Sequence, residues 1–207
     1  PTIVFYCGGD DHVTADETKE VISTLGDVAE LFDANGKSHR IPNITAAQQG
    51  VVSQFVSKVK SISAARPASS PAVMASPPRP SNGAEQVIQK GPFDKINPSQ
   101  VKLKLICIPQ AGMGAWAYHG WQAKAPAGVE VLPVEMPGRG VRSINTRWCD
   151  WKTVREGLTD ELIAAKCFDR KYVIYGHSLG GWIAHELVGE LSRRGLPPPQ
   201  LLLISGI

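Results

Sequence analysis

The segment from Lys171 to Leu187 constrains the fold more than any other part of the chain. It contains an apolar strand pattern, the pentapeptide Gly176-His177-Ser178-Leu179-Gly180 and the start of an amphipathic helix. In such a strand-turn-helix the central serine has a strained backbone, and small residues two positions before and after it let helix and strand pass closely. Its hydroxyl then projects beside the positive end of the helix, where developing negative charge is stabilised. The pattern predicts Ser178 as a nucleophile, with a glycine-rich turn of no chemical role as the alternative.

Apolar strands alternate with helices through the rest of the chain. Strands that are apolar throughout indicate a mostly parallel sheet with helices on both faces. Ligands of such sheets bind beyond the carboxyl ends of the strands. Strands are expected at Thr2–Cys7, Val28–Phe32, Leu103–Ile108, Val129–Val134, Tyr172–Tyr175 and Leu201–Ser205, and helices from Thr14, over the apolar stripe Val51–Val59, at Trp151–Lys166 and at Gly181–Arg194.

A linker is predicted at residues 62–98, because this stretch holds seven of the sixteen prolines, is rich in Ser and Ala, and lacks apolar periodicity. It separates an N-terminal piece, residues 1–61, from a C-terminal piece, residues 99–207. Each piece has the strand and helix order of part of an α/β protein. The fold class is therefore α/β, in two partial modules or in one module with a permuted chain order.

An acyl-transfer site with a serine nucleophile also needs two backbone N–H groups directed at the oxyanion. The N–H of Leu179, directly after the nucleophile, is one candidate. The loop from Pro109 to Gly114 follows an earlier strand and contains two glycines. We assign the second donor to Ala111, with Gln110 as the alternative.

Composition narrows the class of protein further. The net charge of +3 is too small to indicate a nucleic-acid partner. The stretch of about 18 apolar residues that a membrane span requires is absent from the sequence, and the four scattered cysteines, expected to be reduced and mostly buried, favour a cytoplasmic location. Neither a metal nor an organic cofactor is expected, because the sequence lacks ligand-spaced His and Cys clusters and a phosphate-binding loop.

The C-terminal piece, from about Leu103 to Ile207, resembles the type II thioesterases of polyketide and nonribosomal peptide synthesis, which have the α/β-hydrolase fold. Four separated motifs carry the resemblance, and the third is the most diagnostic: Ile108-Pro109-Gln110-Ala111-Gly112, Trp121, Leu132-Pro133-Val134-Glu135-Met136-Pro137-Gly138-Arg139-Gly140-x-Arg142, and Gly-His-Ser-Leu-Gly-Gly from Gly176.

This resemblance implies hydrolysis of an acyl thioester on the phosphopantetheine arm of an acyl carrier protein, or of an acyl-pantetheine, through an acyl-serine intermediate. The pathway would be polyketide, nonribosomal peptide or fatty acid synthesis, and the chain could belong to a larger multidomain synthase. Arg139 and Arg142 either meet an acidic carrier protein or pair with nearby carboxylates in a structural turn.

The N-terminal piece, residues 1–61, resembles the C-terminal end of an α/β-hydrolase of the family of serine hydrolases. Gly8-Gly9-Asp10-Asp11-His12-Val13 follows a strand, and the resemblance implies Asp11 as the triad acid, with Asp10 in reserve. Gly36-Lys37-Ser38-His39-Arg40-Ile41-Pro42 implies His39 as the general base, although Lys37 and Ser38 depart from the usual glycine. The alternatives are a helix-capping role for the aspartates and a loop role for His39. The other histidines, His12, His119, His177 and His185, are weaker candidates for the base.

Two arrangements explain an end of one hydrolase followed by the beginning of another. In the first, the chain is a segment of tandem hydrolase modules that is cut inside both, which the start at Pro1 and the stop at Ile207 fit. In the second, the chain is one circularly permuted hydrolase, whose N-terminal strands dock beside the strand that ends at Ser205. The first is the preferred expectation from sequence.

Three functions remain open at this point. A thioesterase leads, a carboxylesterase for small oxygen esters is a second enzymatic reading, and a non-catalytic fragment that binds carrier proteins is the third. The third is compatible with the same fold, because function depends on the site and not on the scaffold.

Overall fold

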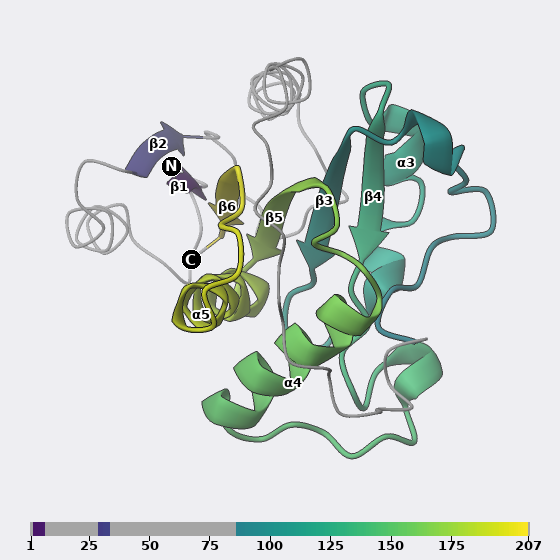
Figure 1. Cartoon of the computed structure of the whole chain (residues 1–207). Coiled ribbons are helices and arrows are strands. Elements are labelled where there is room, and N and C mark those ends of the chain that lie inside the picture. Colours follow the sequence, from purple (N-terminus) through teal and green to yellow (C-terminus); the bar gives the residue numbers. More distant parts are fainter. Residues whose placement is uncertain (1, 7–28, 34–85, 207) are drawn as a thin grey trace.

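The computed structural model describes residues 2–6, 29–33 and 86–206 of the chain. The two short N-terminal stretches are strands, and the third range contains the remaining elements (Figure 1). In chain order the elements are β1 (Thr2–Tyr6), β2 (Ala29–Asp33), η2 (Pro98–Gln100), β3 (Leu103–Ile108), η3 (Ala115–Tyr118), α3 (Trp121–Lys124), β4 (Val129–Pro133), η4 (Gly140–Arg142), α4 (Trp151–Ala164), β5 (Lys171–His177), α5 (Leu179–Arg193) and β6 (Leu201–Ser205). The helices predicted near Thr14 and over Val51–Val59 lie outside the described residues.

The described strands form one sheet in the order β2-β1-β6-β5-β3-β4. Every neighbouring pair is parallel, which confirms the predicted parallel sheet. The ends of β3 and β6 coincide with the prediction. Helix α5 begins at Leu179, two residues earlier than expected, because the backbone enters the helix directly after Ser178.

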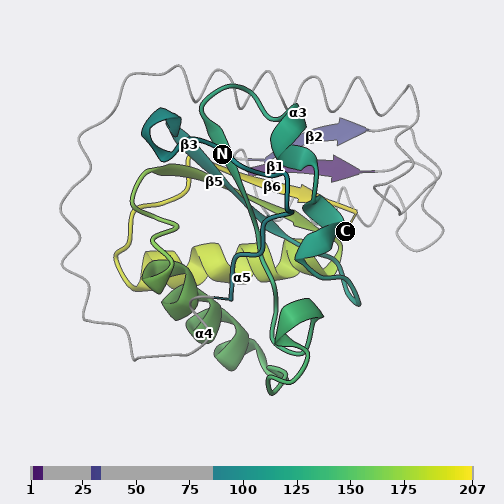
Figure 2. The same ribbon diagram turned by 90° about the vertical axis from the view of Figure 1, so that its right-hand side faces the viewer.

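Both faces of the sheet are covered in the described part of the chain. Figure 2 shows α4 and α5 on one face and α3 on the other. Alternation of side chains along β3 divides the core, since Ile106 and Ile108 pack with α4 and α5, whereas Leu105 and Cys107 pack with η3 and α3. All of these strand side chains are buried. Within the described residues, no helix is long and apolar enough to cross a membrane.

The two N-terminal strands join the sheet at β6. Strand β1 pairs in parallel with β6, with Phe5 opposite Ser205, and β2 pairs with β1 on its other side. Ser205 is also opposite His177 at the end of β5. The carboxyl ends of β5, β6, β1 and β2 therefore lie along one edge of the sheet.

Residues 86–98, the described end of the predicted linker, contact the C-terminal piece. Val87 is fully buried, and Ile88 forms an antiparallel bridge with Val134. The carboxylate of Asp94 accepts hydrogen bonds from the backbone N–H groups of Gly91 and Gly120. This part of the chain packs against the outer edge of the sheet beside β4.

Helix α5 approaches the sheet so closely that only glycine fits at two positions. A Cβ atom on Gly176 would lie 2.1 Å from the carbonyl oxygen of Gly180, and a Cβ on Gly180 would lie 2.3 Å from the carbonyl oxygen of Ile108. Helix α5 thus contacts β5 and the end of β3 through backbone atoms. The contact fixes the first turn of α5 beside the loop that follows β3.

Buried polar groups hold the loops at this edge. The hydroxyl of Tyr118 donates a 2.8 Å hydrogen bond to the carbonyl oxygen of Ile108. Arg142, only 2% exposed, forms a bidentate ion pair with Glu161 of α4, at 2.6 and 2.8 Å. It also donates a 2.9 Å hydrogen bond to the carbonyl oxygen of Glu135. Of the two readings of this arginine, the structural turn is correct, because the guanidinium is buried inside the molecule and joins the loop after β4 to α4.

Substituting Gly180 by Ala tests the close approach of α5. The added methyl group meets the Ile108 carbonyl oxygen, so Gly180→Ala should lower the free energy of unfolding by about 1–3 kcal/mol, as overpacking does. The matched control is Gly189→Ala in the same helix, where nothing lies within 4 Å of the added Cβ. That control should stabilise by about 0.5–1 kcal/mol. Urea unfolding measures both, and equal effects would contradict the packing described for Gly180.

Removing one partner of the buried ion pair should destabilise the chain strongly. Arg142→Met leaves the carboxylate of Glu161 buried without its counter-charge and should cost about 3–5 kcal/mol. The double variant Arg142→Met/Glu161→Leu should recover most of this loss, because neither charge then remains. The exposed pair of Lys152 with Glu156, 3.4 Å apart, is the control, and Lys152→Met should change stability by less than about 1 kcal/mol. A loss for Arg142→Met no larger than the control would refute the structural role.

Candidate active site

Ser178 has the backbone conformation of a strained strand-to-helix turn. Its φ is 51° and its ψ is −126°, so its backbone is in a region that residues with a side chain rarely adopt. Its N–H donates a 2.8 Å hydrogen bond to the carbonyl oxygen of Ser205, and its own carbonyl accepts a 2.7 Å bond from Gly181. These bonds and the glycine contacts hold the strain in place. The half-buried serine lies between the end of β5 and the start of α5, as predicted.

The loop after β3 contains a tight turn beside this serine. The N–H of Met113 donates to the carbonyl oxygen of Gln110 at 3.2 Å, and Gly112 has a φ of 79°, which suits the third position of a type II turn. Because a Cβ on Gly180 would also lie 2.7 Å from the carbonyl oxygen of Pro109, this loop contacts the first turn of α5. Ala111 thus lies in a turn held near Leu179, while its assignment as an oxyanion donor, like that of Leu179, stays a prediction.

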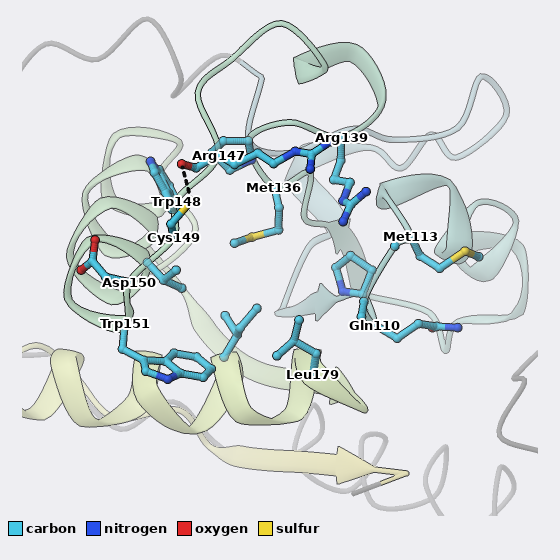
Figure 3. A pocket seen from close by; sticks show the side chains of 16 residues that line it. Gln110, Met113, Met136, Arg139, Arg147, Trp148, Cys149, Asp150, Trp151 and Leu179 are labelled. Carbon is cyan, nitrogen blue, oxygen red and sulfur yellow. Dashed lines mark hydrogen bonds between the residues drawn. The ribbon is translucent and has the colours of Figure 1, made fainter. Parts of the chain in front are cut away.

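A cavity of about 370 Å³ opens between this loop, the loop after β4 and the starts of α4 and α5. In Figure 3, Met136 lies between Trp148 and Trp151 on the α4 side and Gln110 and Met113 on the opposite side. The lining is mainly apolar. It is made up of Pro109, Gln110, Ala111, Gly112, Met113, Met136, Pro137, Arg139, Arg147, Trp148, Cys149, Asp150, Trp151, Val154, Leu179 and Ile183. The lining includes Leu179 and Ala111, whose N–H groups are the predicted oxyanion donors, and the alternative Gln110.

Glu135 joins two of the loops that border the cavity. It is 3% exposed, and one carboxylate oxygen accepts a 3.3 Å hydrogen bond from the N–H of Ala115. A Cβ on Gly114 or on Gly140 would lie 2.5 or 2.1 Å from this carboxyl group, so a side chain at either position would displace the carboxyl group. Burial raises the pKa of Glu135 above its usual range, although Arg142 opposes that shift. The carboxyl group acts as an internal support of the loops.

The described histidines are held by contacts of their own. His177, 3% exposed, has Nδ1 2.8 Å from the hydroxyl of Ser205, which also lies 2.8 Å from the hydroxyl of Tyr175. His119 has Nε2 3.2 Å from the carbonyl oxygen of Gln89, on the other side of β4. His185 is exposed on α5, 4.0 Å from Glu186. Their ranking as general bases stays a prediction.

The structure does not describe the other predicted members of the triad. These are the acid Asp11, its alternative Asp10 and the base His39, and His12 also lies outside the described residues. The strands that precede them are described. Asp11 follows the end of β1 at Tyr6, and His39 follows the end of β2 at Asp33. Both strands end at the sheet edge that carries Ser178.

The sequence reasoning missed the segment from Arg147 to Trp151, which forms one wall of the cavity. Asp150 caps α4 by accepting hydrogen bonds from the N–H and hydroxyl of Thr153, at 2.8 and 2.6 Å. Trp148 and Trp151, on either side of the N-cap Asp150, could have indicated this wall in the sequence, since large aromatic residues in a polar loop often line binding sites. Trp151 is 47% exposed, which is consistent with an open wall.

The comparisons with known proteins match the same part of the chain. It is 38% identical over 108 residues to the AMB antimetabolite synthetase AmbE of Pseudomonas aeruginosa, which covers 52% of this chain and 5% of that protein. It is 31% identical to the gramicidin S biosynthesis protein GrsT of Aneurinibacillus migulanus, over 52% of this chain and 41% of that protein. The chain thus spans less than half the length of these curated relatives.

Solved structures agree with this match. RedJ, a thioesterase from the prodiginine biosynthetic pathway in Streptomyces coelicolor, is 29% identical with a TM-score of 0.50, over 68% of this chain and 50% of RedJ. A second RedJ structure gives 34% identity and a TM-score of 0.50, over 53% and 45% of the two chains. The profile of the thioesterase domain family matches residues 103–207, just over half of the 207 residues. The chain therefore belongs to the thioesterase domain family and has the α/β-hydrolase fold of its structural relatives.

Proposed function

We propose that this chain is a serine thioesterase that hydrolyses acyl thioesters held on the phosphopantetheine arm of a carrier protein. One observation carries the proposal. Ser178 has a φ of 51° between two glycines that no other residue can replace without a clash, and it lies next to a cavity lined by Leu179 and Ala111. This arrangement occurs in a chain of the thioesterase domain family.

The proposed reaction proceeds in two steps. The hydroxyl oxygen of Ser178 attacks the thioester carbonyl, its proton passes to His39, and the N–H groups of Leu179 and Ala111 stabilise the oxyanion. Collapse of the tetrahedral intermediate breaks the carbon–sulfur bond, and the pantetheine thiol leaves with a proton from His39. Water, deprotonated by His39, then hydrolyses the acyl-serine and releases the acid. Asp11 orients His39 throughout.

The sheet order supports a site built from both ends of this one chain. Strands β1 and β2 continue the sheet beyond β6, and Phe5, Ser205 and His177 are opposite one another across three strands. In the α/β-hydrolase fold the acid and the histidine follow strands beyond the one that carries the serine. Residues 1–61 would then supply these groups to residues 99–207 of the same molecule. Among the two arrangements, this observation favours the circularly permuted hydrolase over tandem modules.

The partner and location are part of the same proposal. The curated relatives include an antimetabolite synthetase and a gramicidin S biosynthesis protein, so a carrier protein of a biosynthetic assembly is the partner we propose. Cys107, Cys149 and Cys167 are free thiols, which suits the reducing conditions of the cytoplasm. Hydrolysis of small oxygen esters is the second candidate function, since the same serine, base and oxyanion donors serve both reactions.

Active-site labelling tests the triad. A fluorophosphonate probe should label the wild-type chain at Ser178, and Ser178→Ala should abolish the labelled band. His39→Ala should lower the labelling rate by about 10³-fold or more, because the serine loses its general base. His185→Ala, an exposed histidine on α5, is the matched control and should label at the wild-type rate. Labelling of His39→Ala at the control rate would show that His39 is not the base.

Substrate choice separates the candidate functions. With acyl-pantetheine and p-nitrophenyl esters of the same acyl chain, kcat/KM should be higher for the thioester, because binding of the pantetheine arm in the cavity should outweigh the better leaving group of the p-nitrophenyl ester. A higher value for the oxygen ester would favour the carboxylesterase. Binding of acyl-pantetheine without turnover, unchanged in Ser178→Ala, would instead support a non-catalytic binding fragment.

A further inference from the structure

Two arginines line the rim of the cavity, and the only carboxyl group among the described residues that Arg139 is seen to act on is that of Glu135, which is buried behind Gly114 and Gly140. Arg139 and Arg147 both belong to the lining, and Figure 3 shows them on the same side of the cavity, beside Met136. Within residues 86–206, neither guanidinium has an ion pair or a side-chain hydrogen bond. Arg142 belongs to the same motif as Arg139, but it is buried and forms an ion pair with Glu161.

The side chain of Arg147 lies close to the backbone next to Arg139. A Cβ on Gly138, the neighbour of Arg139, would lie 2.3 Å from Cγ and 2.9 Å from Nε of Arg147. The side chain of Arg147 therefore packs against Gly138, whose φ of 76° and lack of a Cβ atom leave the space for it. Two guanidinium groups held at one rim match the oxygen atoms of a carboxylate or phosphate well.

The acidic groups near this rim are held by other contacts. Asp150 belongs to the cavity lining, but its carboxylate accepts the N–H and hydroxyl hydrogen bonds of Thr153 at the start of α4. Glu135 is buried behind Gly114 and Gly140 and accepts from Ala115. The remaining lining near Arg139 and Arg147 is mainly apolar, and attraction between opposite charges is stronger beside apolar walls than in water.

We propose that Arg139 and Arg147 form an anion subsite at the rim of the cavity, which binds an oxyanion group of the thioester substrate. This inference rests on the proposed function, because it assumes that the cavity receives a thioester. The group is either the phosphate of the phosphopantetheine arm or a carboxylate at the end of the acyl chain. Both present oxygen acceptors with negative charge to the same pair of guanidinium groups.

Binding measurements in the Ser178→Ala background distinguish the two sources without turnover. Titration calorimetry compares 4′-phosphopantetheine with pantetheine, which lacks the phosphate. It also compares malonyl-pantetheine with acetoacetyl-pantetheine, in which a methyl ketone replaces the carboxylate. Arg139→Gln and Arg147→Gln remove one guanidinium each. Lys152→Gln is the control for charge alone, because Lys152 lies on α4 next to Trp151, is 72% exposed and is not part of the lining.

The anionic member of one pair should bind at least about tenfold more tightly than its neutral counterpart, as expected for charge-assisted hydrogen bonds to two arginines. Each arginine variant should lose most of this preference, and Lys152→Gln should keep it. The pair that responds identifies the phosphate or the carboxylate. Equal affinity within both pairs, or a preference that survives both arginine variants, overturns the inference and leaves the thioesterase proposal intact. No binding of any of the four ligands would contradict both.

Discussion

The close backbone contact between α5 and the sheet is the constraint on which the rest of this site depends. At Gly176 and Gly180 the helix, β5 and the end of β3 meet without side chains between them. The same contact places Ser178 at a φ of 51° and brings the loop after β3 against the first turn of the helix. A larger residue at either glycine would separate the nucleophile from the loop that is predicted to hold the oxyanion. Strain at one residue is thus maintained by the packing of three elements.

Buried polar interactions give the cavity its walls. Tyr118 ties the end of β3, Arg142 ties the loop after β4 to α4, and Glu135 lies between two glycines that bring these loops together. Each group is expensive to bury alone and stabilising once its hydrogen bonds are made. The cavity therefore depends on polar contacts behind it, while its surface is largely apolar. Arg139 and Arg147 belong to its lining, and we propose that they bind the oxyanion group of a substrate.

The sequence predicted the features that depend on neighbouring residues. The spacing of glycines around Ser178 and the apolar runs of the strands are local signals, so the elbow and the ends of β3 and β6 were predicted correctly. The role of Arg142 was left open, because its partner Glu161 is 19 residues away on another element. The wall formed by Arg147 to Trp151 was missed because the residues that face it across the cavity are distant in sequence. Pairing of β1 with β6 joins opposite ends of the chain, and local patterns carry no information on such contacts.

The central claim is that Ser178 becomes acylated by a base supplied from the same chain. Its most direct test is the intact mass of the chain after brief incubation with an acyl-pantetheine, followed by mapping of the modified peptide. The account predicts a mass increase of one acyl group on the peptide that contains Ser178, and no increase for His39→Ala. An unmodified wild-type chain, or an acyl group on another residue, would contradict it.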